Sequence, residues 1–312
     1  MEGLEGLKLI KNNNLLKAKK ILITGATGFL GSHLLPTLVE KGYNIIILKR
    51  SFSNIWQIQN VLSQIKSYDI DKVSIKEIFD ENKIEGIIHI ATDYGRKNNN
   101  DITQMFKANI ELPTQLLDLG CKHRIVFFIN THTFLNSKYM LYSAMKNSFI
   151  EIAKYFSDNF KVKFINMKLE HVYGEKDEYS KFIPFIIKNI LEKKTIEVTK
   201  GEQKRDFIYV QDVVNAYLKV LDNLRNLDEG FIEFAIGTGI STAIRDFVNK
   251  IEEQINKKAN IKWGEIAYRK NEIFDSRAHI EKVKHYLGWS PKYDISSGLK
   301  RTVDWYKKSI NR

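Results

Sequence analysis

A glycine-rich segment near the start of the chain constrains its fold more than any other feature. Residues 20–35 read KILITGATGFLGSHLL, in which an apolar run of strand length is followed by Gly25, Gly28 and Gly31 and then by a helical pattern. Glycine permits a tight turn and lets the backbone approach a pyrophosphate, while the N-terminus of the following helix offers free N–H groups. A strand, such a loop and a helix in sequence predict a dinucleotide-binding site; a purely structural glycine turn is the alternative.

Strand-like and helix-like segments continue to alternate beyond this loop. The strand-length runs are almost continuously apolar, as expected for parallel strands covered on both faces. They are KILITG (20–25), NIIILKR (44–50), GIIHIAT (86–92), RIVFFIN (124–130) and VKFINMKL (162–169). We therefore predict an α/β fold with a doubly wound parallel sheet, the Rossmann arrangement.

The pattern becomes irregular after about residue 175, so we expect a smaller mixed α/β region in the C-terminal part. The predicted cofactor-binding domain comprises residues 18–170 and about 206–238, the second domain comprises residues 171–205 and 239–312, and residues 1–17 form an N-terminal extension. The extension has no long apolar stretch and no small-residue cleavage site, so we interpret it as a short helix and linker and not as a signal peptide.

Composition excludes several classes of partner. The formal net charge is +12, but basic residues are scattered among acidic ones and form no block interleaved with aromatic residues, so we predict no nucleic-acid partner. The single cysteine, Cys121, excludes an intramolecular disulfide and fits a reducing compartment. No apolar run is long enough to cross a bilayer. We expect a cytoplasmic protein with no membrane partner and no metal.

The end of the second strand-like run indicates which cofactor is used. NAD enzymes place an acidic residue there to accept a hydrogen bond from the ribose 2′-hydroxyl, whereas this chain has Lys49, Arg50 and Ser51. A carboxylate would repel a 2′-phosphate, and a guanidinium can pair with it through two hydrogen bonds. The predicted cofactor is therefore NADP(H); the alternative is that Arg50 stacks on the adenine or faces solvent.

Two Tyr-x-x-x-Lys patterns compete for a catalytic role. They are YDIDK, with Tyr68 and Lys72, and YSAMK, with Tyr142 and Lys146. Residues four apart share one face of a helix, and a nearby ammonium lowers the pKa of a phenol from about 10. YSAMK opens a long amphipathic segment soon after the run at 124–130, so we choose Tyr142 and Lys146 and regard the other match as accidental.

These motifs together resemble the extended branch of the short-chain dehydrogenase/reductase superfamily, the NAD-dependent epimerases and dehydratases. Matches to signatures of that branch cover most of the chain: TGATGFLGSHL, HIAT (89–92), YSAMK, RDFIYVQDVV (205–214) and YRKNEI (268–273). The resemblance implies an enzyme that moves a hydride between a nicotinamide and a sugar carbon. It also implies a nucleotide-diphosphate sugar as substrate and a homodimer as the assembly.

The resemblance implies roles for individual residues. Tyr142 would exchange a proton with the reacting oxygen, and Lys146 would bind the nicotinamide ribose and tune the phenol. Thr131 matches the threonine of the pattern S/T-x-x-[VF]-Y-G, which hydrogen-bonds the reacting oxygen, with Thr133 as the alternative. Asn109 in KANIELP resembles a helix asparagine that supports the active site.

The same resemblance, with the residues at the second strand end, assigns the ligand contacts. The cofactor contacts are Gly25, Thr27, Gly28, Phe29, Leu30, Gly31, Lys49, Arg50, Ser51, Asp69, Ile70, Ala91, Tyr142 and Lys146. The substrate contacts are Thr92, Thr131, His132, Thr133, His171, Lys181, Arg205, Arg269 and Glu272. Arg205 would approach the diphosphate or the ribose of the nucleotide, Arg269 would bind the diphosphate and Glu272 the nucleotide ribose, although a surface salt bridge is the commoner fate of an arginine.

Several reactions share this scaffold. Dehydratases of the branch carry Thr-Asp-Glu at the catalytic threonine, whereas this chain has Thr-His-Thr at 131–133, so dehydration is not expected. The segments FINTHT, KLEHVYG, SKF and GEQKRDFIYVQDVV resemble most the CDP-abequose synthase group, which reduces a CDP-4-keto-deoxyhexose with NADPH. We predict a 4-ketoreductase for a nucleotide-linked 4-keto-6-deoxy sugar, with CDP favoured, in surface polysaccharide biosynthesis such as O-antigen or capsule. The alternatives are an epimerase with tightly bound NAD and a non-catalytic NADP-binding protein.

Overall fold

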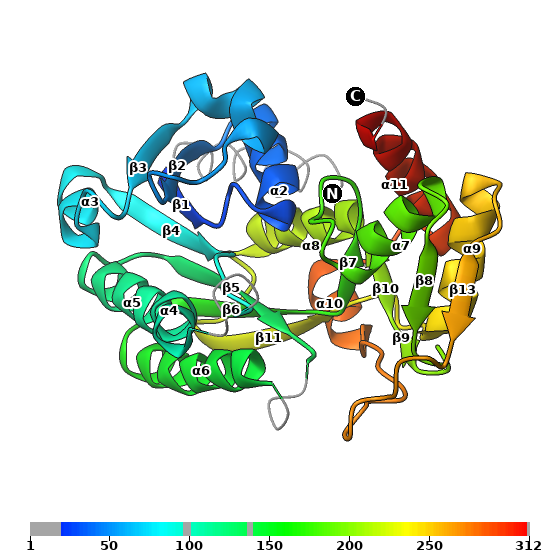
Figure 1. Ribbon diagram of the computed structural model, residues 1–312. Helices are drawn as coiled ribbons and strands as arrows, with labels where there is room; N and C mark the ends of the chain where they lie inside the picture. Colours follow the sequence, from blue (N-terminus) through cyan, green and yellow to red (C-terminus); the bar gives the residue numbers. More distant parts are fainter. Residues whose placement is uncertain (1–19, 96–100, 136–139, 311–312) are drawn as a thin grey trace, which may run out of the picture. The chain divides into compact units, whose positions relative to one another are not determined.

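The computed structural model of the protein describes residues 20–95, 101–135 and 140–310 (Figure 1). Its contacts divide into two units, one of residues through Lys168 with Val220–Phe234 and one of Leu169–Lys219 with Ala235–Arg312. The domain boundary expected from the sequence, at 170–171, lies close to this division. Residues 206–219 and 235–238, which we expected with the cofactor domain, group with the second unit. The expected extension at residues 1–17 lies outside the described residues.

A seven-stranded sheet forms the centre of the first unit. The strand order is β11-β6-β5-β4-β1-β2-β3, and parallel pairing joins β1 to β2 and β4, β2 to β3, and β4 to β5. The strands are β1 (Lys20–Thr24), β2 (Asn44–Lys49), β3 (Lys66–Asp69), β4 (Ile84–His89), β5 (Phe127–Thr133), β6 (Lys163–Leu169) and β11 (Gly230–Ile236). The five runs predicted as strands are β1, β2, β4, β5 and β6, so the doubly wound α/β fold is confirmed.

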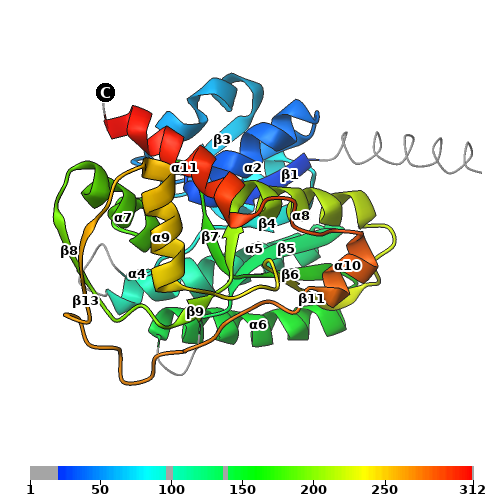
Figure 2. The ribbon, with the colours of Figure 1, turned by 90° about the vertical axis from the view of Figure 1, so that its right-hand side faces the viewer.

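Helices cover both faces of this sheet. Figures 1 and 2 show α2 on one face and α5 and α6 side by side on the other. The helical segments of this unit are α2 (Phe29–Glu40), a 3₁₀ helix η1 (Trp56–Gln64), α3 (Ile75–Glu81), α4 (Ile102–Phe106), a π-helical turn η2 (Lys107–Glu111), α5 (Leu112–Lys122) and α6 (Leu141–Asn159). Covering both faces explains why β1 and β2 are apolar at almost every position.

Helix α6 carries the chosen Tyr-Lys pattern and is anchored by an aromatic cluster. Phe149, Ile150 and Ala153 recur at helical spacing and are buried. Phe149 packs against Phe128 of β5 and Phe164 of β6, with ring centroids 6.1 and 6.0 Å away. Burial of one such aromatic side chain stabilises the fold by about 2 kcal/mol. These contacts anchor the middle of α6 to the sheet.

The second unit contains three small two-stranded sheets and a set of helices. β7 (His171–Tyr173) pairs in parallel with β10 (Phe207–Tyr209), β8 (Thr195–Val198) in parallel with β13 (Asn260–Trp263), and β9 (Lys204–Arg205) antiparallel with β12 (Thr242–Ala243). The helices are α7 (Phe182–Leu191), α8 (Val210–Asn223), α9 (Ile244–Ile255), α10 (Glu281–Leu287) and α11 (Ile295–Ile310). Helices α9 and α11 pack side by side (Figure 2).

Both aspartates of the RDFIYVQDVV segment tie this unit together. The buried carboxylate of Asp206 accepts hydrogen bonds from the backbone N–H groups of Thr238, Gly239 and Ala278. Asp212 accepts from two further backbone N–H groups, those of residues 292 and 293, at 2.9 and 3.0 Å. Two buried carboxylates with several donors each fix distant segments of the chain. These acids therefore act in the fold, which leaves the arginine of the segment as its candidate ligand group.

Candidate active site

The glycine turn after β1 contains two glycines that the packing requires and one that faces open space. Gly25 has a φ of 72°, and a Cβ atom added there would lie 2.5 Å from the backbone nitrogen of Ala91. A Cβ atom added at Gly31 would lie 2.2 Å from the carbonyl oxygen of Gly25, so a glycine here lets α2 pack against the turn. At Gly28 the first contact would be at 3.4 Å, and this residue is exposed. A ligand can therefore approach the backbone at Gly28.

The N-terminus of α2 suits an anionic group. The helix is 12 residues long, has no side-chain cap at Gly28 and has no acidic residue in its first turn. Its first N–H groups and its positive dipole end are thus not neutralised from within the helix. Thr27, Phe29 and Leu30 lie at this turn, and Leu30 is buried, so it can offer a ligand only its backbone. The turn fits the diphosphate of a dinucleotide.

The loop after β4 is tied to the glycine turn through Thr24. Its Oγ1 accepts hydrogen bonds from the backbone N–H groups of Ile90 and Ala91, at 3.3 and 3.2 Å, and lies 2.8 Å from Nδ1 of His89. Burial lowers the pKa of His89 to about 3, so this imidazole is neutral at physiological pH. His89 therefore anchors the strand ends and carries no charge. Ala91, an expected cofactor contact, is placed beside the glycine turn.

Lys49 and Asp69, both predicted cofactor contacts, form an ion pair with each other. The pair joins the ends of β2 and β3, and Lys72 lies 3.7 Å from the same carboxylate. Ile70 follows β3 and donates its backbone N–H to the carbonyl oxygen of Lys49 at 2.9 Å. The ion pair uses the Lys49 ammonium, which leaves Arg50 as the cation at this strand end that is suited to a 2′-phosphate.

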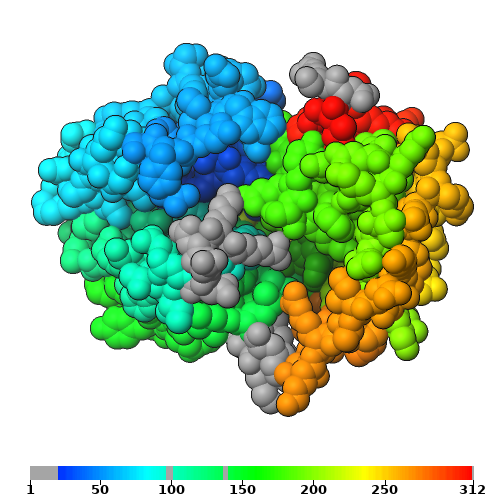
Figure 3. Space-filling view, viewed as in Figure 1, coloured from blue at the N-terminus to red at the C-terminus, as the bar shows by residue number. Residues whose placement is uncertain are grey.

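Arg50 stands beside an aromatic ring, and its neighbour Ser51 is bonded to an acid. Its guanidinium carbon lies 4.7 Å from the ring centroid of Phe52, which is 71% exposed. Ser51 donates its backbone N–H and its hydroxyl to the carboxylate of Asp71, at 2.7 and 2.5 Å, and these bonds lower the pKa of Asp71. Figure 3 shows the azure segment that follows β2 at the molecular surface. Asp71 was missed from the sequence because it follows a different strand, β3.

Tyr142 and Lys146 lie in the first turns of α6 and are both buried, with 5% and 6% of their surface exposed. The Nζ of Lys146 donates to the backbone carbonyl oxygen of Thr131 at 2.6 Å and lies 5.8 Å from the ring centroid of Tyr142. The structure thus brings Tyr142, Lys146 and the β5 segment that carries Thr131 together. A phenol, an ammonium and a threonine at one strand end are the groups that the sequence predicts for proton transfer.

The ionisation of this pair differs from the expectation in one respect. Burial raises the pKa of Tyr142 well above its ordinary value, and the predicted lowering by a nearby ammonium is not the dominant effect. Burial also lowers the pKa of Lys146 to about 8. The reason is that both groups are desolvated, while the Nζ of Lys146 bonds to the carbonyl oxygen of Thr131. The phenol is therefore protonated at neutral pH, as a general acid must be.

Asn109 supports the loop that follows β4. It lies in the π-helical turn η2, is 3% exposed, and accepts hydrogen bonds from Thr92 Oγ1 at 2.8 Å and from the backbone N–H of Asp93 at 3.1 Å. Its Nδ2 donates to the carbonyl oxygen of Asp93 at 2.8 Å. This loop places the ring of Tyr94 against the ring of Tyr142, with centroids 4.4 Å apart. Sequence reasoning gave no role to Tyr94, and no signal in a single sequence marks it.

His132 and Thr133 have local partners. His132 is buried, and its Nε2 lies 3.0 Å from Oδ1 of Asn147 on α6. Burial and the charges of Lys146 and Lys168 lower its pKa to about 4, so His132 is neutral at physiological pH. Thr133 Oγ1 accepts a hydrogen bond from the backbone N–H of residue 135 at 3.1 Å, as in a strand-end turn. The Thr133 hydroxyl accepts in this bond and keeps its own proton to donate, so Thr131 stays the predicted catalytic threonine and Thr133 the alternative.

In the second unit, Arg205 and Glu272 form an ion pair whose side chains are 11% and 14% exposed. Arg205 also donates to the backbone carbonyl oxygens of Lys204, at 2.7 Å, and Ile273. Arg269 lies in the same segment as Glu272 and is exposed. The structure therefore brings Arg205 together with the segment that carries Arg269 and Glu272, more than 60 positions further along the chain.

Two other residues predicted to contact substrate have acidic partners. Lys181 precedes α7, and its Nζ lies 2.8 Å from the buried carboxylate of Asp177. His171 begins β7, and its Nδ1 lies 3.1 Å from Oε2 of the buried Glu170. A ligand that binds either residue has to compete with, or add to, these contacts.

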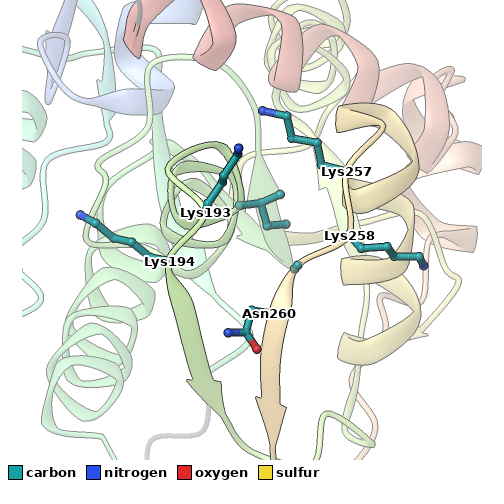
Figure 4. A pocket seen from close by; sticks show the side chains of 7 residues that line it. Lys193, Lys194, Lys257, Lys258 and Asn260 are labelled. Carbon is teal, nitrogen blue, oxygen red and sulfur yellow. The ribbon is translucent and has the colours of Figure 1, made fainter.

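A lysine-rich hollow in the second unit has a structural explanation. Its volume is about 400 Å³, and Figure 4 shows Lys194 pointing away from Lys193 and Lys257. Lys194 pairs with Glu192 at 2.7 Å, and Lys258 pairs with Glu252 at 3.0 Å. These lysines follow the C-termini of α7 and α9, where a positive charge compensates the helix dipole. The hollow is lined by residues outside every predicted site.

Within residues 20–95, 101–135 and 140–310, no cluster of three or more histidine, cysteine, aspartate or glutamate residues could hold a metal ion. Over the same ranges, no helix has the length and apolar character needed to cross a membrane.

Comparison with known proteins identifies the family. The model of the NAD dependent epimerase/dehydratase family matches residues 21–237. The chain is 39% identical over 292 residues to CDP-abequose synthase of Salmonella muenchen, with 91% of this chain and 97% of that protein covered. The chain belongs to the NAD-dependent epimerase/dehydratase family. The resemblance drawn from the motifs is therefore confirmed, and this protein is an enzyme of the short-chain dehydrogenase/reductase superfamily that uses a nicotinamide cofactor.

Other members of the family share the sequence or the fold over a similar length. CDP-abequose synthase of Salmonella typhimurium is 35% identical over 294 residues, covering 91% of this chain and 97% of that one. Among solved structures, UDP-glucose 4-epimerase of Thermotoga maritima has a TM-score of 0.81 and 24% identity, covering 93% and 99%. An epimerase of Methanothermobacter thermautotrophicus has a TM-score of 0.84 and 19% identity, covering 97% and 96%. These structures show the extended fold of the family.

Proposed function

We propose that this protein uses NADPH to reduce the 4-keto group of a nucleotide-linked 4-keto-6-deoxy sugar, and that the nucleotide is CDP. The observation that carries the proposal is the 39% identity to a CDP-abequose synthase over 91% of this chain and 97% of the relative. The Thr-His-Thr sequence at 131–133 lacks the acid pair of the dehydratases, which supports reduction over dehydration. In this proposal the first unit binds the cofactor and the second unit binds the nucleotide sugar.

Tyr142 is the proposed general acid. The bound nicotinamide supplies the hydride that reaches C4 of the sugar. Tyr142 gives its phenolic proton to the C4 oxygen as negative charge develops there, and burial keeps this proton on the phenol until then. Thr131 donates a hydrogen bond to the same oxygen, where a fixed donor stabilises the developing alkoxide. Lys146 holds the cofactor ribose, and its charge stabilises the phenolate that Tyr142 becomes.

Arg50 supports the choice of NADPH. Its side chain is exposed and lies over the ring of Phe52 at the end of β2, so its guanidinium is available to a 2′-phosphate. Removing one charge-assisted contact of this kind costs about 2 kcal/mol, or about thirtyfold in affinity. Arg50→Ala should therefore weaken NADPH binding about thirtyfold and leave NADH binding almost unchanged, which fluorescence titration of both cofactors measures. Arg124→Ala, at a distant surface arginine, is the matched control.

The diphosphate of the substrate is assigned to Arg205 and Arg269. Two guanidinium groups, carried by two segments that contact each other, suit a dianionic diphosphate. Glu272, the partner of Arg205, is assigned to the nucleotide ribose. When a diphosphate binds, it replaces part of the Arg205–Glu272 contact, which frees the carboxylate to accept a hydrogen bond from a ribose hydroxyl. His171, Lys181, Thr92 and His132 complete the proposed substrate contacts.

An epimerase with tightly bound NAD is the second candidate. One observation favours it: the carboxylate of Asp71 is held beside Ser51 at the end of β2. An acid at this strand end accepts hydrogen bonds from the 2′-hydroxyl of NAD and repels a 2′-phosphate. The two candidates therefore differ in which group, Arg50 or Asp71, faces the adenosine ribose.

Further proposals concern assembly and setting. We place the enzyme in the cytoplasm, as a homodimer that forms through the helices spanning about 101–119, which include α4 and most of α5, and 142–157 of α6, in the biosynthesis of a surface polysaccharide such as an O-antigen or capsule. Exposed apolar side chains on these helices support the dimer: Phe106 on α4 is 47% exposed, and Leu141 and Tyr155 on α6 are 46% and 61% exposed. Sedimentation of the wild type and of Tyr155→Lys, which places a charge on this face, tests it.

The experiment that tests the function is a cofactor and substrate panel. Purified protein is incubated with NADPH or NADH and with CDP-, dTDP- or GDP-linked 4-keto-6-deoxy sugars, and oxidation of the cofactor is followed by absorbance. The proposal predicts stoichiometric oxidation of NADPH with the CDP-linked sugar. The reductase proposal would be overturned if a nucleotide sugar were interconverted without net oxidation of the cofactor and if the denatured protein released NAD. The protein would then be an epimerase.

A further inference from the structure

Tyr94 lies closer to the proposed acid than its place in the sequence suggests. It belongs to the loop after β4, and its ring lies against that of Tyr142 with centroids 4.4 Å apart and planes inclined by 31°. Tyr142 is 5% exposed and Tyr94 is 41% exposed. Tyr94 is therefore the member of this aromatic pair that faces solvent and covers the other.

The backbone on both sides of Tyr94 is held in place. Asn109, itself buried, bonds to both backbone groups of Asp93 and to the hydroxyl of Thr92. The side chain of Asp93 then accepts the backbone N–H of Gly95 at 2.7 Å, which closes a tight turn around Tyr94. These four hydrogen bonds hold the backbone from which the Tyr94 side chain extends toward Tyr142.

The remaining surface of Tyr142 packs against apolar side chains. Met105 of α4 and Met145 of α6 form a small buried cluster with its ring. Met145 is on the same helix as Tyr142, whereas Met105 and Tyr94 come from segments far away in the sequence. The orientation of the phenol thus depends on side chains from several segments, of which Tyr94 lies next to solvent.

We propose that Tyr94 is a positioning residue, whose ring fixes the orientation of Tyr142 and keeps water from its phenol. The inference rests on the proposed role of Tyr142 as the proton donor. A general acid has to lie within hydrogen-bond reach of the oxygen it protonates, and a small misplacement of a reacting group lowers the rate strongly. Tyr94 meets Tyr142 both through its ring and through its hydroxyl, whose hydrogen bond helps to raise the pKa of the Tyr142 phenol. We assign the positioning role to the ring, because the ring covers the face of Tyr142.

Two substitutions separate the ring from the hydroxyl. Tyr94→Ala removes the ring and should lower kcat about tenfold while leaving the KM for the cofactor unchanged, because the glycine turn is untouched. Tyr94→Phe keeps the ring and should recover most of that loss. Tyr286→Ala, at a tyrosine of α10 that is 48% exposed, is the matched control for loss of an exposed ring and should keep the wild-type kcat. Thermal unfolding of each variant checks that the fold persists.

A second readout does not depend on turnover. Tyr142 titration is obtained as the difference in phenolate absorbance between a protein and the same protein with Tyr142→Phe. The groups around this phenol are Lys146 on α6 and Thr92 and Tyr94 in the loop after β4. Tyr94→Ala admits water to the phenol and should shift this titration to lower pH, whereas Tyr94→Phe should shift it less.

The outcomes distinguish this inference from the proposed function. An unchanged kcat and an unchanged titration in Tyr94→Ala would overturn it. A Tyr94→Phe variant as slow as Tyr94→Ala would also overturn it, because the hydroxyl and not the ring would then matter. If the wild type reduces no 4-keto sugar, the proposed function fails, and the titration of Tyr142 still decides whether Tyr94 shields it.

Discussion

Tyr142 and Lys146 lie on one face of a helix, whereas Tyr68 and Lys72, with the same spacing, lie in β3 and the turn after it. In the first pair both side chains are buried, and Lys146 donates its Nζ proton to a strand-end carbonyl oxygen. In the second pair Lys72 is exposed and lies 3.7 Å from Asp69. The motif thus occurs once buried in the candidate active site and once in a strand and the exposed turn after it.

The hydroxyl of Tyr68 has a structural task. It donates to Glu81 Oε2 at 2.5 Å and accepts from Nδ2 of the buried Asn82 at 2.9 Å. The ring also lies under the ammonium of Lys66, which is 4.7 Å from its centroid. This phenol is therefore committed to the link between β3 and α3. A spacing of four residues places two side chains on one face only when the segment is a helix. A catalytic role also requires that the two side chains be buried at the site where the cofactor binds.

The largest expected difference between the pairs concerns the two phenols. Tyr142→Phe should lower kcat about 10³-fold, because it removes the general acid. Tyr68→Phe should keep the wild-type kcat, because the Tyr68 hydroxyl bonds to Glu81 and Asn82 at the end of α3. Initial rates of NADPH oxidation with the CDP-linked sugar measure both variants. The affinity for NADPH should be the same in both variants. Similar kcat values for the two variants would contradict the claim that Tyr142, and not Tyr68, is the general acid.

The lysines should differ by a smaller factor. Lys146→Met removes the charge that stabilises the phenolate and the ribose contact, so kcat should fall about 10²-fold and the KM for NADPH should rise. Lys72→Met removes an exposed ammonium near Asp69, and both constants should stay within about twofold of the wild type. Steady-state kinetics with varied NADPH distinguishes them. A Lys146→Met variant with unchanged constants would contradict the assignment of this lysine.

The pH dependence sharpens the contrast. Burial lowers the pKa of Lys146 to about 8, so the ammonium is present below that pH and is lost as the pH rises through it. The rate should therefore fall above pH 8, by about tenfold for each further pH unit. Folding stability should change in the opposite direction. Between the folded-state pKa of about 8 and the ordinary pKa of 10.5, the unfolded chain binds the lysine proton and the folded chain does not, so the free energy of unfolding rises with pH over this range. Lys146→Met should abolish this rise, which urea titrations at several pH values test.

The smallest effect is on stability and belongs to the other pair. Tyr68→Phe removes the hydrogen bonds to Glu81 and Asn82, and the free energy of unfolding should fall by about 1 kcal/mol. Asn82 keeps its bond to the carbonyl oxygen of Ile78, which limits the loss. Urea denaturation of Tyr68→Phe and of the wild type measures it. No loss would show that water replaces the phenol at this position.

The sequence was sufficient to predict the elements of the fold and the motifs near one another along the chain. The apolar runs that became β1, β2 and β4 are almost unbroken because both faces of each strand are covered, and the glycine pattern marks a turn whose close contacts exclude a Cβ atom. Such signals are local, so a single sequence contains them.

Contacts between distant segments could not be predicted. Asp71 meets Ser51 because β2 and β3 are neighbours in the sheet, and Tyr94 meets Tyr142 because the loop after β4 lies beside α6. The direction of the pKa shift of Tyr142 was also missed, because it depends on how deeply the side chain is buried. Each of these features follows from the packing of strands and helices, which the motifs do not specify.

Transfer of a labelled hydride tests the central claim most directly. The protein is incubated with NADPH that carries deuterium at the transferable position of the nicotinamide and with a CDP-linked 4-keto-6-deoxy sugar, and the product is examined by mass spectrometry and NMR. The account predicts a reduced sugar with one deuterium at C4, formed by the wild type and by Tyr68→Phe and almost absent with Tyr142→Phe. Sugar product without deuterium, or equal labelling by Tyr142→Phe, would contradict it.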